Sequence, residues 1–217
     1  LIKANSPDKK RKAVLEKEGW SFLLKIIDLK TNKDVQVGSV NLEDVEVVWI
    51  KPNEIFFIEK PSFLFTSSAW SYALKEKTFN YLFQNESGLM LNWSKDGSLT
   101  LKFSGGELSL INNEDSQTIN LPFVTLPNKC TFSDNNKKIY CAIPKTVPSS
   151  VVLPDDYLKN KFYPQDQIIS LSINPIEIEI VLDADNGKEL DAINPMTVGD
   201  YLYFKNRYDN KIYKIKL

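Results

Sequence analysis

The chain has 217 residues, of which 42% are apolar and 12% aromatic, enough to form a buried core. Its 27 basic and 28 acidic residues give a net charge of −1, which argues against a nucleic-acid-binding protein, since these normally carry a basic excess. The sequence contains no histidine, which excludes Ser-His-Asp and Cys-His catalytic arrangements and histidine-containing metal sites within this chain.

No apolar run approaches the ~18–20 residues that a transmembrane helix needs, so we expect no membrane span within the chain. The chain starts at Leu1, without a methionine. We therefore expect a trimmed piece of a longer protein, in which an upstream targeting segment or anchor would not be visible.

Taken in chain order, the apolar residues mostly alternate with polar ones, which is typical of β-strands. The strongest hairpin signal is W-S-K-D-G-S-L-T-L-K-F at 93–103, where a D-G turn separates two alternating runs. Related turns begin at residues 6, 50, 94, 133 and 197, at spacings of 44, 44, 39 and 64. The last spacing is interpreted as one repeat carrying an insertion of about twenty residues.

Two further strand-like runs follow each of the first four hairpins. They are 20–29 and 34–40, 69–74 and 78–83, 107–111 and 117–121, and 167–173 and 176–182. The fifth hairpin is followed by 211–217 alone. Trp20 and Trp70 each open a predicted third strand and are interpreted as structurally equivalent.

Four strands in about forty residues are typical of a β-propeller blade. We therefore predict an all-β fold, a single β-propeller domain over 1–217, built from four-stranded antiparallel blades. The predicted blades are 1–44, 45–88, 89–126, 127–191 and a partial fifth at 192–217. The complete ring is either closed by an upstream strand or larger than this chain. A two-sheet β-sandwich is the alternative fold, but it would not explain a repeated turn at near-fixed spacing.

The segments W-S-K-D-G-S-L-T-L-K-F and G-E-L-S-L-I, with S-P-D-K-K near the start, resemble the WD40-like repeats of TolB-type β-propellers. Similar repeats occur in the propeller domains of prolyl-oligopeptidase-type peptidases. The turns I-K-P-N at 50–53 and T-V-G-D at 197–200 depart from the family pattern. The resemblance implies the fold and leaves the function open, because propellers carry many unrelated activities.

In a blade, the connections between strands two and three emerge on the same face as the connections between blades. Three long connections fall on this face: 144–166, 59–68 and 183–191. Their aromatic residues are candidate contacts for a partner, with packing within the fold as the alternative reading. The candidates are Tyr157, Phe162, Tyr163, Phe63 and Phe65.

The connection 183–191 carries Asp183, Asp185 and Asp191, whose oxygens are candidate ligands for Ca²⁺. Gly187 stands where the EF-hand pattern requires a ligand, so a solvated acidic turn is the alternative. No other cofactor is expected.

Cys130 and Cys141 flank the fourth hairpin. If Phe132 pairs with Ile139, the two cysteines lie directly opposite each other on antiparallel strands, because both pairs of residue numbers sum to 271. This geometry suits a disulfide, which would indicate an extracytoplasmic location. Two buried free thiols are the alternative.

The sequence thus favours a non-catalytic propeller, outside the cytoplasm, that binds a protein, peptide or glycan on the face carrying these connections. One alternative is the substrate-gating propeller of a serine peptidase whose catalytic domain lies outside the chain. Another is a purely structural propeller with no ligand.

Overall fold

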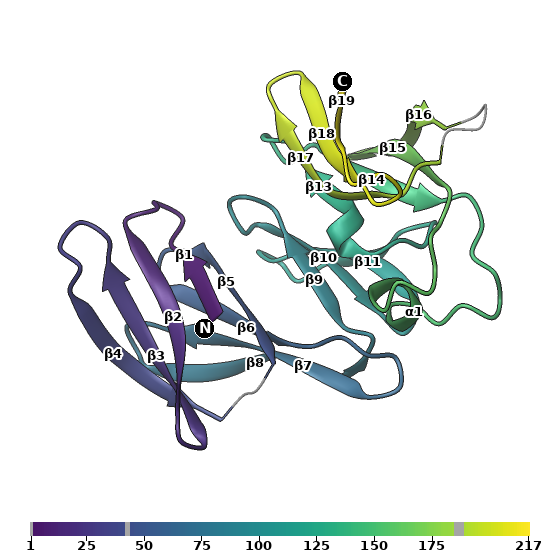
Figure 1. Cartoon of the computed structure of the whole chain (residues 1–217). Helices are drawn as coiled ribbons and strands as arrows, with labels where there is room; N and C mark the ends of the chain where they lie inside the picture. Colours follow the sequence, from purple (N-terminus) through teal and green to yellow (C-terminus); the bar gives the residue numbers. More distant parts are fainter. Residues whose placement is uncertain (1, 42–43, 185–188) are drawn as a thin grey trace. The chain divides into compact units, whose positions relative to one another are not determined.

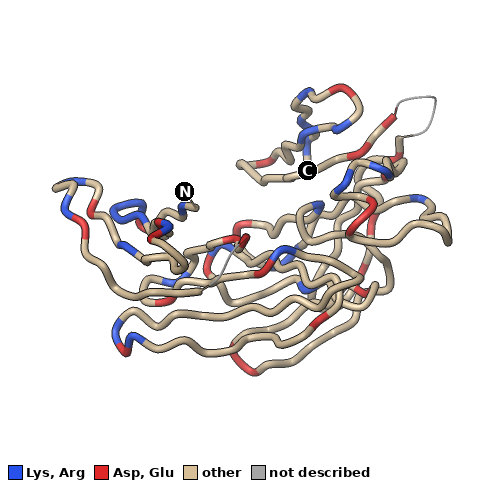
Figure 2. Tube along the Cα trace, turned by 60° about the horizontal axis from the view of Figure 1, so that its bottom comes forward, with Lys and Arg blue, Asp and Glu red and all other residues tan. Residues whose placement is uncertain are grey.

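The computed structural model describes residues 2–41, 44–184 and 189–217 (Figure 1). The chain separates into two compact units, Leu1–Leu89 (unit 1) and Met90–Leu217 (unit 2). Within each unit, basic and acidic residues are interspersed along the chain (Figure 2). The prediction that all five sheets form one domain remains a prediction.

Unit 1 contains two four-stranded antiparallel sheets, each with its strands in chain order. The first sheet comprises β1 (Ile2–Asn5), β2 (Arg11–Glu18), β3 (Ser21–Asp28) and β4 (Asp34–Val40). The second comprises β5 (Val45–Lys51), β6 (Glu54–Glu59), β7 (Thr66–Ala73) and β8 (Thr78–Ser87). The first strands of the two sheets, β1 and β5, lie against each other.

Unit 2 begins with a sheet of β9 (Met90–Trp93), β10 (Leu99–Ser104), β11 (Glu107–Asn112) and β12 (Thr118–Asn120). After the short 3-10 helix η1 (Pro127–Lys129) come β13 (Cys130–Phe132), β14 (Lys138–Pro144), α1 (Asp155–Leu158), β15 (Asp166–Ile173) and β16 (Ile176–Asp183). The last sheet has three strands, β17 (Ala192–Val198), β18 (Tyr201–Asn206) and β19 (Ile212–Lys216). First strands again meet, since β13 lies against both β9 and β17.

The recurring hairpin turns share one hydrogen-bond pattern. In the third sheet the Ser94 hydroxyl donates to Asp96 (2.7 Å) and accepts from the Leu99 amide (3.0 Å). Ser6 and Ser133 occupy the same place in the first and fourth sheets. The residue after the acid or amide has a positive φ in each copy, at Lys9, Gly97 and Asn136. The repeated serine therefore closes the turn, which explains its recurrence in the sequence.

Apolar side chains fill the space between neighbouring sheets. In unit 1, Leu15, Leu24, Trp49 and Phe57 belong to one buried cluster. In unit 2, one cluster lies between the first two sheets and another between the last two. Most residues of the outer strands β8 and β16 are exposed. Sheets that pack face to face around buried clusters, with exposed outer strands, are typical of propeller blades. The structure therefore confirms the predicted all-β fold of four-stranded antiparallel sheets.

One detail differs from expectation. Trp20 does not open a strand: it lies in the β2–β3 turn and is 99% exposed, whereas Trp70 lies within β7 and is half-buried. Their predicted equivalence is therefore wrong, because Gly19 at positive φ ends β2 and places Trp20 at the tip of the hairpin. None of the helices in the described residues has the length and apolar character that crossing a bilayer requires.

Candidate functional site

Besides the short β10–β11 turn, antiparallel pairing brings four connections of unit 2 to one end of its sheets, which we call its loop face. They are 121–129 before β13, 145–165 between β14 and β15, 184–191 before β17, and 207–211 between β18 and β19. Residues 185–188 of the third connection lie outside the described residues. The second connection, 145–165, contains α1 and is called the insertion below.

A buried group of charged side chains lies beneath this face. The Lys129 ammonium group, only 1% exposed, donates to Asp166 Oδ2 (2.7 Å), Asp191 Oδ1 (2.5 Å) and Tyr157 Oη (3.3 Å). The Tyr157 hydroxyl donates to Asp191 Oδ1 (2.9 Å). Burying these charges costs free energy, which the mutual ion pairs and hydrogen bonds offset. The cluster thus joins the insertion to the starts of β13, β15 and β17.

Asp166 is the least satisfied member of the cluster. Its Oδ2 atom accepts from Lys129 and from the Ala192 amide (2.8 Å), but its buried Oδ1 has no hydrogen-bond partner among the residues that the structure describes. Burial raises the pKa of Asp166 to about 7, although the Lys129 ammonium group opposes this shift. Burial together with the Asp191 carboxylate also raises the pKa of the Tyr157 hydroxyl. We therefore expect the protonation of Asp166 to change near neutral pH.

Arg207, in the β18–β19 turn, holds the insertion against the last sheet. Its Nη1 donates to Asp191 Oδ2 (2.8 Å) and its Nη2 to Asn160 Oδ1 (2.7 Å). The guanidinium carbon lies 4.0 Å from the centre of the Tyr157 ring and 4.4 Å from that of Tyr163. Hydrogen bonds from two nitrogens to different residues, together with the stacking contacts, suit a planar guanidinium, so the insertion is docked rather than loosely attached.

The three predicted contact residues of the insertion have different environments. Tyr157 is only 4% exposed and occupied by the charged cluster, so it is unavailable to a partner in this arrangement. Phe162 packs against the apolar core. Tyr163 is 43% exposed, and its ring lies 5.7 Å from that of Tyr208. The insertion also exposes Val147, Val152 and Leu158.

The other two predicted contact residues, Phe63 and Phe65, lie between β6 and β7 on the corresponding face of unit 1. Phe65 is 75% exposed, and Leu64 beside it is equally open to solvent. The loop is closed by hydrogen bonds from Ser87 to the Phe63 carbonyl (2.7 Å) and from Ser67 to the Lys60 carbonyl (2.9 Å). Because the two units are described separately, these residues are not grouped with the insertion.

The predicted calcium ligands have other partners. Asp191 belongs to the buried cluster, and Asp183 forms an ion pair with Lys145. Asp185 lies outside the described residues. Among the described residues, no group of three or more acidic or cysteine side chains is arranged to hold a metal ion.

Cys130 and Cys141 are directly opposite each other in the β13–β14 ladder, in the register expected from the sequence. The structure joins them by a disulfide, and both residues are buried. The disulfide thereby cross-links β13, the strand that follows η1, to β14.

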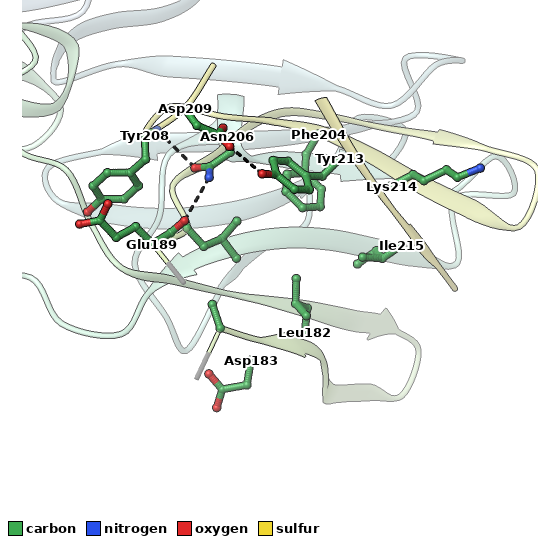
Figure 3. A pocket seen from close by; sticks show the side chains of 12 residues that line it. Leu182, Asp183, Glu189, Phe204, Asn206, Tyr208, Asp209, Tyr213, Lys214 and Ile215 are labelled. Atoms are coloured by element: carbon green, nitrogen blue, oxygen red, sulfur yellow. Dashed lines mark hydrogen bonds between the residues drawn. The ribbon is translucent and has the colours of Figure 1, made fainter. Parts of the chain in front are cut away.

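A cavity of about 760 Å³ opens beside the cluster, between the end of β16 and the strands β18 and β19 (Figure 3). Its walls combine apolar, aromatic and acidic side chains. They come from Leu182, Asp183, Ala184, Glu189, Leu190, Phe204, Asn206, Tyr208, Asp209, Tyr213, Lys214 and Ile215. Tyr208 links the cavity to the insertion, because its hydroxyl donates to the Tyr163 carbonyl (3.2 Å).

Sequence reasoning missed Lys129, Asp166 and Arg207. Only the pairing of distant strands brings these charges together. A weak signal was present: Lys129 directly precedes β13 and Asp166 is the first residue of β15, and at a buried strand end a charged residue must either leave the core or find a partner.

No protein-family model and no curated protein sequence matches the chain. Solved structures do. TolB from Acinetobacter baumannii matches all of the chain with a TM-score of 0.54 and 14% identity, over 54% of TolB. An oligogalacturonate lyase from Vibrio parahaemolyticus matches 98% of the chain with a TM-score of 0.64 and 8% identity, over 64% of the lyase. Dipeptidyl peptidase 4 from Porphyromonas gingivalis matches 99% with a TM-score of 0.63 and 12% identity, over 38% of the peptidase.

The chain thus spans 54% of TolB and 64% of the lyase. Identities this low establish the fold and nothing about activity. The meandering four-stranded sheets, the meeting of their first strands and these likenesses agree: the chain has the β-propeller fold found in TolB and in the propeller domains of peptidases.

Proposed function

We propose that the chain is a non-catalytic β-propeller module, located outside the cytoplasm, that binds a protein, peptide or glycan partner on its loop face. The observation that carries this proposal is the docked insertion, which exposes Val147, Val152, Leu158 and Tyr163. Exposed apolar side chains gathered on a rigidly held loop are typical of a recognition surface, because binding then costs little conformational entropy.

Two further observations support the proposal. The lack of histidine removes the commonest general base, so a binding role is favoured over catalysis. The Cys130–Cys141 disulfide favours an oxidising compartment, since structural disulfides are rare in the cytosol.

A direct test compares two variants against the same panel of immobilised peptides and glycans. Leu158→Ser/Tyr163→Ala removes apolar surface from the insertion, while Lys95→Ala/Lys137→Ala alters exposed turns at the opposite end of the same unit. Ligands selected with the unaltered protein should lose at least about tenfold in affinity with the first pair and less than about twofold with the second. Equal binding by both variants, with native circular dichroism, would refute the proposed face.

A second function rests on the similarity to peptidase structures. The chain covers 38% of the P. gingivalis peptidase, so a propeller of this kind can form part of a larger enzyme. In that case it would gate substrate access. Reading the gene beyond Leu217 tests this directly: a G-x-S-x-G motif followed by a distal histidine would support the peptidase role.

A further inference from the structure

The cavity between β16 and β18–β19 has an apolar floor. Phe204 is buried, and its ring stacks on that of Tyr213 with centres 5.9 Å apart and planes inclined by 16°. Leu182 and Ile215, which lie below this pair in Figure 3, extend the apolar surface. A volume of about 760 Å³ falls within the range of about 300–1,000 Å³ common for ligand sites. The cavity is therefore large enough for several side chains of a ligand.

Among the described residues, the charged side chains that line the cavity are mostly acidic. Lys214 is the basic exception within this set; its ammonium group lies over the Tyr201 ring, 5.0 Å from the centre, and points away from the other lining side chains (Figure 3). Asp183 already pairs with Lys145. Glu189 and Asp209 remain at the end of the cavity nearest the loop face, where both are exposed.

Asp209 is held in place as an anion. The Tyr213 hydroxyl donates to its Oδ2 atom (2.6 Å), and the Lys211 amide donates to its Oδ1 atom (3.0 Å). These hydrogen bonds, with that from Tyr213 the larger influence, lower the pKa of Asp209 below its ordinary value. Asp209 is consequently charged at neutral pH and fixed beside the aromatic ring of Tyr213.

The amide of Asn206 is fully used by the protein. Its Nδ2 donates to the Glu189 carbonyl (3.0 Å), and its Oδ1 accepts from the Asp191 amide (3.0 Å). The cavity therefore offers a ligand carboxylates and apolar surface, but few neutral hydrogen-bonding groups. This favours a cation with an aliphatic stem over a sugar, which needs many polar contacts.

We propose that this cavity binds a basic peptide segment of the partner, placing separate Lys or Arg side chains at Glu189 and at Asp209 and an adjacent apolar residue on the floor of Phe204, Leu182 and Ile215. The inference rests on the proposed function and names the class of its partner. The proposed site is built from described residues alone, and residues 185–188 lie outside the described part of the chain.

The test uses three fluorescein-labelled heptapeptides with alternating residues: Leu and Lys, Leu and Glu, and Leu and Gln. Fluorescence anisotropy at 50 mM and 200 mM salt gives their affinities. We expect the lysine peptide to bind at least about tenfold more tightly than the glutamate peptide, and added salt to reduce this difference because the charges are exposed.

Matched variants locate the binding. Glu189→Lys should weaken binding of the lysine peptide by about tenfold, and Asp209→Asn, which keeps an oxygen acceptor for Tyr213, by about two- to fivefold. Glu114→Lys makes the same change of charge in the β11–β12 turn, at the other end of unit 2, and should change affinity by less than about twofold.

The inference is overturned if the lysine and glutamate peptides bind equally, or if Glu189→Lys and Glu114→Lys have the same effect. Neither result contradicts the proposed function, because that proposal depends on the insertion. Conversely, Leu158→Ser/Tyr163→Ala could leave every selected ligand bound while Glu189→Lys releases the lysine peptide. That outcome would support the cavity as a binding site and refute the insertion as the binding surface.

Discussion

The two units place very different structures at the same position of the blade. Between its second and third strands, the second sheet of unit 1 has a short loop with Leu64 and Phe65 in solvent, closed by serine hydroxyls. The corresponding connection of the fourth sheet, in unit 2, is the insertion, which buries Tyr157 against a charged cluster and is held by Arg207. A repeat scaffold thus tolerates either a short loop or a long insertion at this position, because the hydrogen-bonded strands of each sheet do not depend on the residues of the connection.

The comparison implies that the stability of unit 2 depends on buried charged side chains more than that of unit 1 does. Of the variants considered, Asp191→Ala should therefore reduce the unfolding free energy most. The change leaves Lys129 and Arg207 without their shared acceptor. Removing one partner of a buried ion pair costs about 3–5 kcal/mol of unfolding free energy. Urea denaturation followed by circular dichroism measures this loss.

The control for Asp191→Ala is Glu76→Ala, in the exposed β7–β8 turn of unit 1, which should change the unfolding free energy by less than about 0.5 kcal/mol. Hydrogen exchange gives the spatial check, with protection lost around β13, β15 and β17 and retained in β5–β8. A loss below about 1 kcal/mol for Asp191→Ala would mean that the cluster is not a stabilising element.

The Cys130–Cys141 disulfide is the second stabilising feature of unit 2, and removing it should cause the next largest loss of stability. The double variant Cys130→Ala/Cys141→Ala opens a short loop, and loss of a native disulfide costs about 2–4 kcal/mol. The double variant should have a lower melting temperature in thermal unfolding. Treatment of the unaltered protein with a reductant under unfolding conditions should reproduce the shift, and failure to do so would point to lost packing by the cysteines instead.

Asp166 should make the stability of unit 2 depend on pH. In the folded state its pKa is about 7, above the ordinary value of 3.8, so between these values the folded chain holds a proton that the unfolded chain has lost. Stability from this group is present at low pH and falls as pH rises toward 7, with a slope of at most ~1.4 kcal/mol per pH unit.

Asp166→Asn removes this titration, so its melting temperature should vary less between pH 4 and 7 than that of the unaltered protein. Asp115→Asn, at an exposed turn of the same unit, serves as the control and should keep the original slope. If the melting temperatures of the unaltered protein and Asp166→Asn change with pH in parallel, Asp166 is ionised throughout this range.

The sheets were predictable because their determinants are local. Ser94, Asp96 and Gly97 close a turn within a few residues, and related turns recur along the chain. The pairing of Cys130 with Cys141 was also accessible, since one antiparallel register fixes every other pair in the ladder.

The charged cluster was not predictable for the opposite reason. Lys129, Asp191 and Arg207 come from three separate connections, and none has a local partner that marks it. The sequence left Tyr157 open between contact with a partner and packing within the fold, because aromatic residues in a long loop suit either role. Its hydroxyl donates to the buried carboxylate of Asp191. Whether a loop aromatic faces inward depends on distant charges, which periodicity does not encode.

The smallest expected effect on stability belongs to the exposed loop of unit 1. Leu64→Ser/Phe65→Ser removes two side chains that are about three-quarters exposed, so the unfolding free energy should change by no more than about 0.5 kcal/mol. Solubility, measured by ammonium sulfate precipitation, should rise because an apolar patch is removed. The matched variant in unit 2 is Leu158→Ser, which lies on the docked insertion and is less exposed. If the unit 1 variant unfolds markedly more easily, its loop packs against structure in solution, and the contrast between an open loop and a docked insertion fails.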